Sequence, residues 1–501
     1  MDTHFAEKTF DSGFSQIRER CRGISPLDAK LEKWQIDLLT GNSLAEWIDD
    51  FGSPLNVICP EPLVKNIEEL NEVARQRDVD FRVYFARKAN KCLALVDAAV
   101  STGAGIDVAS EQELTQVLNQ GVSGRELICT AAVKNYRLLE ICVNHEVTIA
   151  VDNPDELKQL LIITESLKQN ANIALRLSGF LHDEIKLHSR FGFDIAAIEQ
   201  IVEHIIPDAE QSRIKIIGLH FHLDGYSLSQ RIAAVAQCLP VLDHMRTSGH
   251  QISFLDIGGG LPMCYLENET QWEEFWVQHA EALLGRCEPI TYRNHGLGLI
   301  AINNELHGKR NCYPYYQSPV RAVWLAGLLD AQFESSTIAA ALRNRGVQLR
   351  CEPGRSVLDG CGMTVAQVQF RKQHPYGDWY IGLSMNRTQC RTTSDDFLVD
   401  PILIPKVSIN QTAYLKQTME GYLVGAYCTE SELISLRKFR FPAGVNIGDL
   451  IIFPNTAGYL MHFLESRSHQ FPLANNLVVN RDDHESVQLD KIDRHPLGEM
   501  R

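Results

Sequence analysis

Six stretches of this sequence place reactive or anion-binding groups at the C-terminal end of a short apolar run. They are Lys88, Asp107, Arg176, His222, Gly258–Gly260 and Glu352. A lysine in its neutral form can hold a carbonyl compound covalently, and the other groups can bind and polarise that compound. A single lysine at the end of a strand is usually only solvated. The catalytic interpretation of Lys88 therefore depends on all six stretches lying together.

Two of these stretches have the composition of a phosphate site. Gly258–Gly260 can turn backbone N–H groups toward an anion, and Glu352-Pro-Gly-Arg355 adds an arginine close to a carboxylate. The loops after the seventh and eighth strands are a common phosphate site in α/β barrels. Each stretch alone would be interpreted as a tight turn, with Arg355 solvated.

His220 and His222 are two residues apart in a predicted strand, so their side chains face the same side. Together with Asp224 they have the spacing of metal ligands, so a metal-dependent hydrolase stays among the possible functions. One ring could instead stack on an aromatic cofactor, or both could be hydrogen-bonded inside the protein. The other strand ends offer no obvious further His or Cys ligand, and we expect no metal.

The elements that must position these groups alternate regularly. Helical spacing, as at Glu111–Gln120, Pro154–Gln169 and Ser229–Ser248, separates short apolar runs. Eight such runs predict strands at Arg82–Lys88, Gly105–Ala109, Leu127–Ala131, Thr148–Val151, Ile173–Leu177, Ile217–His222, Phe254–Ile257 and Leu349–Glu352. This alternation predicts an α/β fold, and eight units indicate a (β/α)8 TIM-like barrel, in which the C-terminal strand ends share one pocket.

The rest of the chain predicts three further parts. We expect residues 1–53 to pack with a mainly β C-terminal domain at 361–501, and residues 54–360 to form the barrel, with an insertion at about 261–345. The insertion is too long for one barrel helix. Strands of the β domain are predicted at Met363–Arg371, Trp379–Leu383, Tyr422–Gly425, Leu450–Phe453 and Leu477–Val479.

Composition restricts the partners. The 501-residue chain has a formal net charge of −15, which disfavours nucleic acid or an anionic membrane as the main partner. Its thirteen cysteines include no C-x-x-C pair, Met1–Glu7 does not resemble a signal peptide, and no apolar run reaches membrane-spanning length. We expect a reduced cytoplasmic protein that acts on a small molecule.

Eight stretches, in this order, resemble the fold-type III pyridoxal-phosphate-dependent decarboxylases, the group of diaminopimelate, ornithine and arginine decarboxylases. They are Tyr84-Phe-Ala-Arg-Lys-Ala-Asn90, Gly103-Ala-Gly-Ile-Asp-Val-Ala-Ser-Glu-Gln-Glu-Leu114, Ser189-Arg-Phe-Gly192, Gly218-Leu-His-Phe-His222, Leu255-Asp-Ile-Gly-Gly-Gly260, Glu352-Pro-Gly-Arg355, Gly425-Ala-Tyr-Cys428 and Ala457-Gly-Tyr459. The resemblance covers about residues 53–465. It implies an alanine-racemase-like barrel with a β domain, and decarboxylation of an amino acid through an external aldimine and a quinonoid intermediate.

The resemblance also implies catalytic roles. Lys88 would hold pyridoxal 5'-phosphate as a Schiff base, His222 would stack on its ring, and Glu352 would keep the pyridine nitrogen protonated. Cys428 would help to protonate the substrate carbon. In this family that cysteine comes from the other subunit, which implies a homodimer with shared active sites.

The remaining cofactor contacts follow from the same resemblance. The backbone of Gly258–Gly260, together with Arg355 and Tyr459, would hold the phosphate. Asp107 and Ser110 would support the strand that carries the lysine.

Two departures from the family pattern concern the ligands. Thr429 stands where the family usually has an acidic residue that binds the distal amine of the substrate, and Glu430 lies next to it. A standard basic amino acid is therefore not the expected substrate. Arg387 or Arg391 could bind a substrate carboxylate. After His222 the family has Gly-Ser, whereas this chain has Leu223-Asp-Gly225, and Ser227 could supply the missing hydroxyl.

Three alternatives stay open beside the decarboxylase. A racemase would use the same cofactor, but alanine racemases place an arginine where Glu352 stands. A non-catalytic homologue is disfavoured because Lys88, Glu352 and Cys428 are all present. The third alternative is the metal-dependent hydrolase built on His220 and His222.

Overall fold

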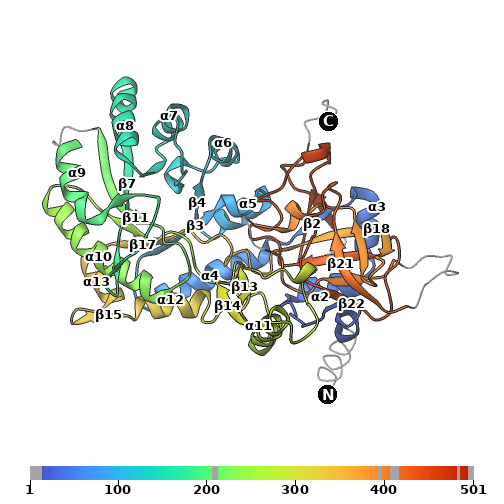
Figure 1. Ribbon diagram of the computed structural model, residues 1–501. Helices are drawn as coiled ribbons and strands as arrows, with labels where there is room; N and C mark the ends of the chain where they lie inside the picture. Colours follow the sequence, from blue (N-terminus) through green and yellow to red (C-terminus); the bar gives the residue numbers. More distant parts are fainter. Residues whose placement is uncertain (1–13, 206–212, 393–395, 407–416, 482–485, 495–501) are drawn as a thin grey trace, which may run out of the picture. The chain divides into compact units, whose positions relative to one another are not determined.

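The structure is a computed structural model that describes residues 14–205, 213–392, 396–406, 417–481 and 486–494. The chain divides into two units, each described here by itself (Figure 1). The barrel unit comprises Leu63–Pro262 and Pro319–Val357. The β unit comprises the described residues of Met1–Pro62, Met263–Ser318 and Leu358–Arg501.

Eight parallel strands form the barrel. In ring order they are β3 (Phe81–Ala86), β4 (Gly105–Val108), β5 (Leu127–Cys129), β6 (Thr148–Val151), β7 (Ala171–Ser178), β11 (Ile214–Phe221), β12 (Phe254–Asp256) and β17 (Gln348–Cys351). β17 pairs with β3, Leu349 opposite Phe81, and this pairing closes the ring. The predicted eight-stranded barrel is therefore confirmed.

Helices connect the strands and begin close to the strand ends. They are α4 (Glu61–Arg75), α5 (Leu93–Ser101), α6 (Glu111–Asn119), α7 (Tyr136–Asn144), α8 (Pro154–Leu167), α9 (Ile198–Ile205), α10 (Leu228–Thr247), α12 (Arg321–Leu329) and α13 (Ile338–Arg345). Side chains cap several of them: Ser110 accepts from the third residue of α6, and Asn153 caps α8. These caps fix the short connections that follow the strands.

The β unit is built around one long strand, β18 (Gly362–Gln373), which pairs with β2 (Leu55–Ile58), β19 (Trp379–Leu383) and β23 (Leu450–Pro454). The sheet is completed by β1 (Arg22–Gly23), β20 (Ile402–Ile404), β21 (Met419–Val424), β22 (Phe439–Phe441), β24 (Asn475–Val479) and β25 (Val487–Leu489). All five strands predicted after residue 361 are present. The prediction of a separate, mainly β domain is confirmed.

The bounds of the units differ from the predicted ones in two places. β2 belongs to the β unit, because it pairs with β18 and β24. The predicted insertion at 261–345 is divided: 263–318, with α11 (Glu269–Leu283) and the hairpin β13 (Leu299–Ile302)–β14 (Glu305–Gly308), clusters with the β unit, whereas α12 and α13 belong to the barrel. Buried aromatic side chains explain the division, since Tyr315 packs on Tyr265 and donates to the carbonyl of Asp396 at 2.8 Å.

Among the described residues, no helix has the length and apolar composition that crossing a membrane would require. The thirteen cysteines all lie in this described part and are free thiols.

The N-terminal helices α2 (Lys33–Thr40) and α3 (Ser43–Phe51) pack into the core of the β unit. Trp34 is 2% exposed and shares a cluster with Leu55 and Met363. Its indole N–H donates to the carbonyl of Gly360 at 2.8 Å. The cluster joins segments that are more than 300 residues apart in the chain.

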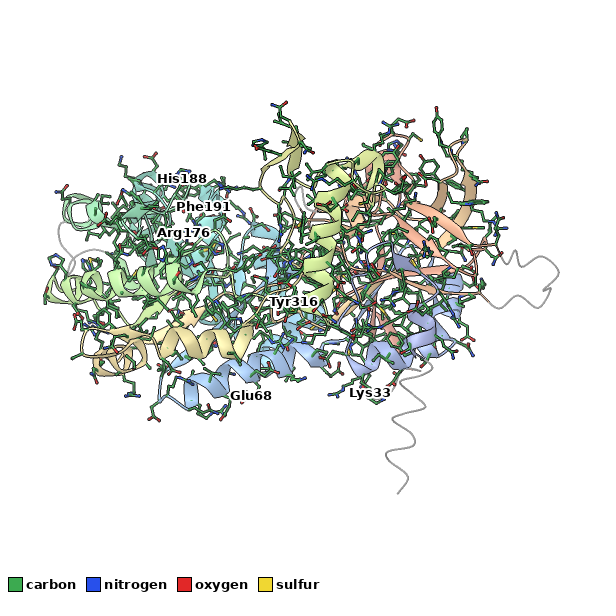
Figure 2. All side chains as sticks on the ribbon, turned by 60° about the horizontal axis from the view of Figure 1, so that its bottom comes forward. Lys33, Glu68, Arg176, His188, Phe191 and Tyr316 are labelled. Carbon is green, nitrogen blue, oxygen red and sulfur yellow. The ribbon has the colours of Figure 1, made fainter. Side chains whose placement is uncertain are left out.

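We expect Trp34→Ala to lower the free energy of unfolding of the β unit by about 3–5 kcal/mol, because it leaves a large cavity and an unpaired carbonyl. Lys33→Ala is the matched control on the same helix, since Lys33 is exposed and pairs with Asp37 at the surface (Figure 2). Its effect should stay within about 0.5 kcal/mol. Urea unfolding followed by tryptophan fluorescence and circular dichroism measures both. Equal midpoints for the two variants would show that α2 is not part of this core.

Candidate active site

Lys88 lies in the single turn η1 (Arg87–Ala89), directly after β3. Its Nζ donates to Oδ2 of Asp107 at 2.5 Å and approaches Oγ1 of Thr130 at 3.5 Å. Thr130 in turn donates to Oδ1 of Asp107 at 2.5 Å. The lysine side chain is 33% exposed while Asp107 is fully buried, so the amine faces accessible space and its counter-ion does not. Thr130 had no predicted role, and its only sequence signal was its place at the end of the third strand.

A buried polar cluster lies at the ends of three other strands. Nε2 of His220 is 3.1 Å from Oε1 of Glu352, and ligand atoms of His220, Glu352 and Asp256 all lie within 4.8 Å of one another. Burial and the charge of Asp107 raise the pKa of Glu352 to about 8. Burial and Glu352 raise the pKa of Asp256 to about 7, and burial lowers the pKa of His220 to about 4. The imidazole is thus neutral, and the two carboxyl groups resist carrying two negative charges together.

The cluster leaves two polar atoms without a hydrogen bond. Nδ1 of His220 and Oδ2 of Asp256 have no partner among the described residues. The three groups are also a chemically reasonable ligand set for a divalent cation. This set differs from the predicted one, because Asp224 is exposed and His222 is engaged elsewhere.

The Gly258–Gly260 loop follows β12 and packs tightly against its neighbours. A Cβ at Gly258 would lie 2.5 Å from the carbonyl oxygen of Phe221, and one at Gly259 would lie 2.9 Å from that of Glu352. Gly258 and Gly260 have φ of 66° and 81°, which favour glycine. The loop must therefore be made of glycine to approach these strands.

Two of the three N–H groups of this loop are already engaged. Gly258 donates to Asp256 at 2.8 Å, and Gly259 donates to Nδ1 of His222 at 3.2 Å. The predicted contact of the Gly258–Gly260 backbone with a phosphate stays a prediction, and in the described structure two of its N–H groups already donate within the protein. The accepting Nδ1 also requires a neutral His222. Burial and the positive charges of Arg231 and Lys88 hold the pKa of His222 well below its usual range.

Arg176, at the end of β7, anchors the stretch Ser189–Gly192. Its guanidinium donates to Asp152 at 3.3 Å and lies 4.1 Å from the ring centre of Phe191 (Figure 2). Asp152 also accepts from the N–H of Gly192 at 3.1 Å. The arginine thus holds a loop at the same end of the barrel.

Two other predicted residues of the barrel unit lie nearby in the chain. Ser110 accepts a hydrogen bond from the N–H of Glu113 and caps α6. It therefore fixes the connection after β4, and its predicted support of the lysine strand stays a prediction. Arg355 is half-buried in the turn after β17.

The remaining predicted residues lie in the β unit. Cys428 is exposed in the turn after β21, and Thr429 and Glu430 line a hollow of about 340 Å³ on the same unit. Tyr459 has φ of 70°, an unusual value for a residue with a side chain, of the kind often found at functional sites.

Arg391, predicted to bind a substrate carboxylate, already has a partner within the β unit. Its Nη2 lies 2.5 Å from Oδ1 of Asp396, and the two side chains are 14% and 3% exposed. The guanidinium is thereby fixed on a buried carboxylate.

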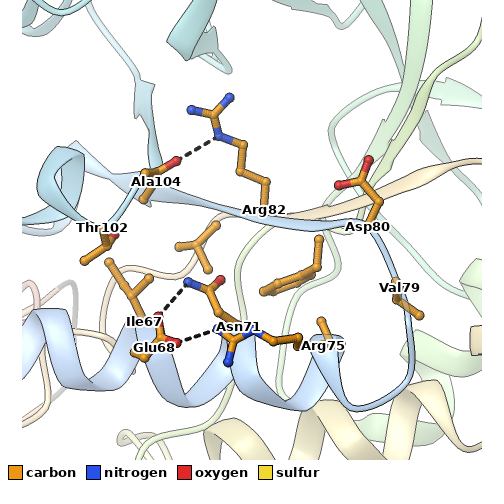
Figure 3. A pocket seen from close by; sticks show the side chains of 13 residues that line it. Ile67, Glu68, Asn71, Arg75, Val79, Asp80, Arg82, Thr102 and Ala104 are labelled. Atoms are coloured by element: carbon orange, nitrogen blue, oxygen red, sulfur yellow. Dashed lines mark hydrogen bonds and ion pairs between the residues drawn. The ribbon is translucent and has the colours of Figure 1, made fainter.

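A second hollow of the barrel unit lies at the opposite end of the strands. It has a volume of about 430 Å³ and is lined by α4, by the start of β3 and by the residues 102–104 that precede β4 (Figure 3). Glu68 there accepts from Asn71 and Arg75 on the same helix. Barrel enzymes bind their substrates at the C-terminal strand ends, so this hollow is not the candidate site.

The chain is similar to proteins of one family. The family model described as pyridoxal-dependent decarboxylase, pyridoxal binding domain, matches residues 64–294. The uncharacterized protein y4yA of Sinorhizobium fredii is 31% identical over 92% of this chain and 94% of its own length. The diaminopimelate decarboxylases of Halalkalibacterium halodurans and Aquifex aeolicus are 27% and 28% identical over 46% of this chain. The chain spans about half of their length, 55% and 56%.

Solved structures show the same fold. Diaminopimelate decarboxylase from Helicobacter pylori, complexed with L-lysine, superposes with a TM-score of 0.64 at 16% identity, over 89% of this chain and 95% of that one. Lysine/ornithine decarboxylase from Vibrio vulnificus, complexed with putrescine, gives 0.62 at 18% identity, over 90% and 100%. With its closed parallel barrel, its separate β domain and its matching pyridoxal-binding region, the chain belongs to the fold-type III pyridoxal-dependent decarboxylase family.

Proposed function

We propose that this protein is an amino-acid decarboxylase that holds pyridoxal 5'-phosphate on Lys88. The proposal rests on three groups that lie together at the C-terminal ends of the strands of one closed barrel. These are the partly exposed Lys88 amine, the buried Glu352 carboxyl and the Gly258–Gly260 loop. Family membership supplies the dependence on pyridoxal.

The residues present fit this cofactor. Burial and the charge of Asp107 raise the pKa of Glu352 more than Lys88 and Arg176 lower it, and a protonated pyridine nitrogen beside Glu352 would favour its carboxylate form. His220 holds Glu352 from the other side through a 3.1 Å contact. We assign the N–H of Gly260 to an oxygen of the phosphate, since the N–H groups of Gly258 and Gly259 already donate within the protein.

The cofactor, when bound, accepts the electron pair that remains after carbon dioxide leaves. The protein groups manage the protons. Lys88 must lose a proton to form its bond, and Asp107, at 2.5 Å, is the base beside it. Glu352 would hold a proton at the ring nitrogen. Cys428, exposed in the β unit, is the proton donor that we assign to the substrate carbon, contributed by the second subunit of a homodimer.

Thr429 bears on the choice of substrate. The relatives from Helicobacter pylori and Vibrio vulnificus are complexed with lysine and putrescine, which carry a distal amine. Thr429 offers no charge to such an amine, and Glu430 lies 4.0 Å from Arg293. We infer that the substrate is not a standard basic amino acid.

A metal-dependent hydrolase is the second candidate, favoured by the cluster of His220, Asp256 and Glu352. It makes no use of Lys88. The spectrum of the purified protein therefore separates the two functions.

Purified protein should show the visible absorption band of bound pyridoxal phosphate, and Lys88→Ala should lose the band together with carbon dioxide release. Lys88→Arg is the matched control for charge, because it keeps a cation beside Asp107 but cannot bond to the cofactor. Both variants should lose activity by several orders of magnitude. Absorbance and a carbon dioxide assay over L- and D-amino acids measure this, and turnover without carbon dioxide would identify a racemase. A colourless protein with stoichiometric zinc would contradict the proposal.

The cofactor-free protein should lose stability as the pH rises from about 5 to 8.5. Glu352 and Asp256 have ordinary pKa values of 4.5 and 3.8, raised by burial to about 8 and about 7. Their neutral forms stabilise the folded state below the ordinary values, and that stability is lost as the pH passes through the raised ones. Glu352→Gln should match the wild type at pH 5 and exceed it by at least about 1 kcal/mol at pH 8.5. Unfolding in urea at each pH measures the difference. Glu165→Gln, at an exposed position, should leave the pH dependence unchanged.

Shared active sites predict complementation between two inactive variants. Lys88→Ala and Cys428→Ala should each have little activity as homodimers. A heterodimer has one site with both residues intact, so randomly mixed subunits should recover about a quarter of the wild-type activity. Co-expression with two affinity tags isolates the heterodimer. Absence of recovery in a confirmed heterodimer would place both residues in sites within one subunit.

A further inference from the structure

Arg231 is a buried cation without an anionic partner. It lies in the first turn of α10, and its side chain is fully buried. Among the described residues no ion pair to Arg231 is found, and burial and Cys351, with no carboxylate, are the causes that act on its pKa. Burial lowers its pKa to about 10, so it still carries its charge at neutral pH. An uncompensated buried charge is costly, which points to an anion that the chain alone does not supply.

The guanidinium contacts both loops at the predicted phosphate end of the site. Nη1 donates to the carbonyl of Ile257 at 2.6 Å, immediately before the glycine loop. Nη2 lies 3.5 Å from the carbonyl of Gly225, in the turn that follows His222. A Cβ at Gly260 would come within 2.5 Å of Nη2, so the charge lies directly against that glycine.

The other partners of Arg231 are weak. The rings of Phe221 and Trp324 have their centres 5.8 Å from the guanidinium carbon, which gives modest cation–π contacts. Its Nε has no hydrogen-bond partner among the described residues. Two carbonyl dipoles and two distant rings do not neutralise a full charge.

Three of the groups that could bind a phosphate are already engaged within the protein. Gly258 and Gly259 use their N–H groups within the protein. Ser227, the predicted substitute for the hydroxyl of the family, is exposed and caps α10 by accepting from Gln230. The site therefore has fewer free donors than the motif indicated.

We propose that Arg231 is a positioning residue for the cofactor phosphate, and that its charge, acting across Gly225 and Gly260, makes the site select a phosphorylated ligand. This inference rests on the proposed function. In the family pattern a serine follows the histidine that corresponds to His222. We assign the role of that serine hydroxyl to Arg231 in this chain. The residue holds the two loops through their carbonyls and places a fixed positive charge behind them.

Arg246 provides a matched control on the same helix. It also donates to backbone carbonyls, those of Ile252 at 2.8 Å and Arg345 at 2.6 Å, but these lie away from the glycine loop. A variant at Arg246 thus removes similar hydrogen bonds without touching the phosphate end.

The test compares the binding of pyridoxal phosphate and of pyridoxal to cofactor-free protein by absorbance and fluorescence titration. Arg231→Met should weaken binding of the phosphorylated form by about 10- to 100-fold and change pyridoxal binding by less than about threefold. Arg246→Met should leave the ratio of the two affinities at the wild-type value. Arg231→Gln keeps a donor for Ile257 without the charge and should behave as Arg231→Met, whereas Arg231→Lys should keep most of the preference. If Arg231→Met does not fold, comparison of Arg231→Gln with Arg231→Lys tests the role of the charge.

Equal weakening of both ligands, or an unchanged ratio in Arg231→Gln, would overturn the role of Arg231 and leave the proposed function standing. Wild-type protein that binds neither ligand would overturn the proposed function itself.

Discussion

Burial of charge at the C-terminal ends of the barrel strands is the constraint on which the site depends. Glu352 and Asp256 share a small buried space with a neutral His220, and Arg231 carries a charge with no counter-ion among the described residues. Each arrangement costs folding free energy when the protein is alone. A ligand with a cationic ring nitrogen and an anionic phosphate would compensate both. On the proposed function, the charges that destabilise the cofactor-free barrel would stabilise the protein with its cofactor bound.

The environment of Lys88 differs from that of these buried groups. Asp107 and Thr130 hold the Lys88 amine in place, and its side chain stays partly exposed. A nucleophile has to meet its ligand and give up a proton, so it needs access and a nearby base. The buried groups need only to hold charge. The amine lies in the turn after β3, whereas the buried cluster lies at the ends of β11, β12 and β17.

The eight strands could be predicted because parallel strands buried on both faces give continuous apolar runs, and the charged residues after them mark their ends. The position of residues 263–318 could not, because contacts such as that of Tyr315 with Asp396 join distant segments and leave no local pattern. Arg231 was missed for a related reason: an arginine in a helical stretch is usually solvated. The hydrogen bond from Gly259 to His222 could not be predicted, because the two residues are 37 positions apart and become neighbours only in the folded chain.

The central claim is that Lys88 carries the cofactor, and chemical trapping tests it most directly. Borohydride reduction of the holoenzyme fixes pyridoxal phosphate on the amine that holds it, and peptide mass spectrometry then locates the modified residue. The account predicts one modified lysine per chain, Lys88, with no labelling when the cofactor is removed first. Label on another lysine, or no label on protein that contains the cofactor, would contradict it.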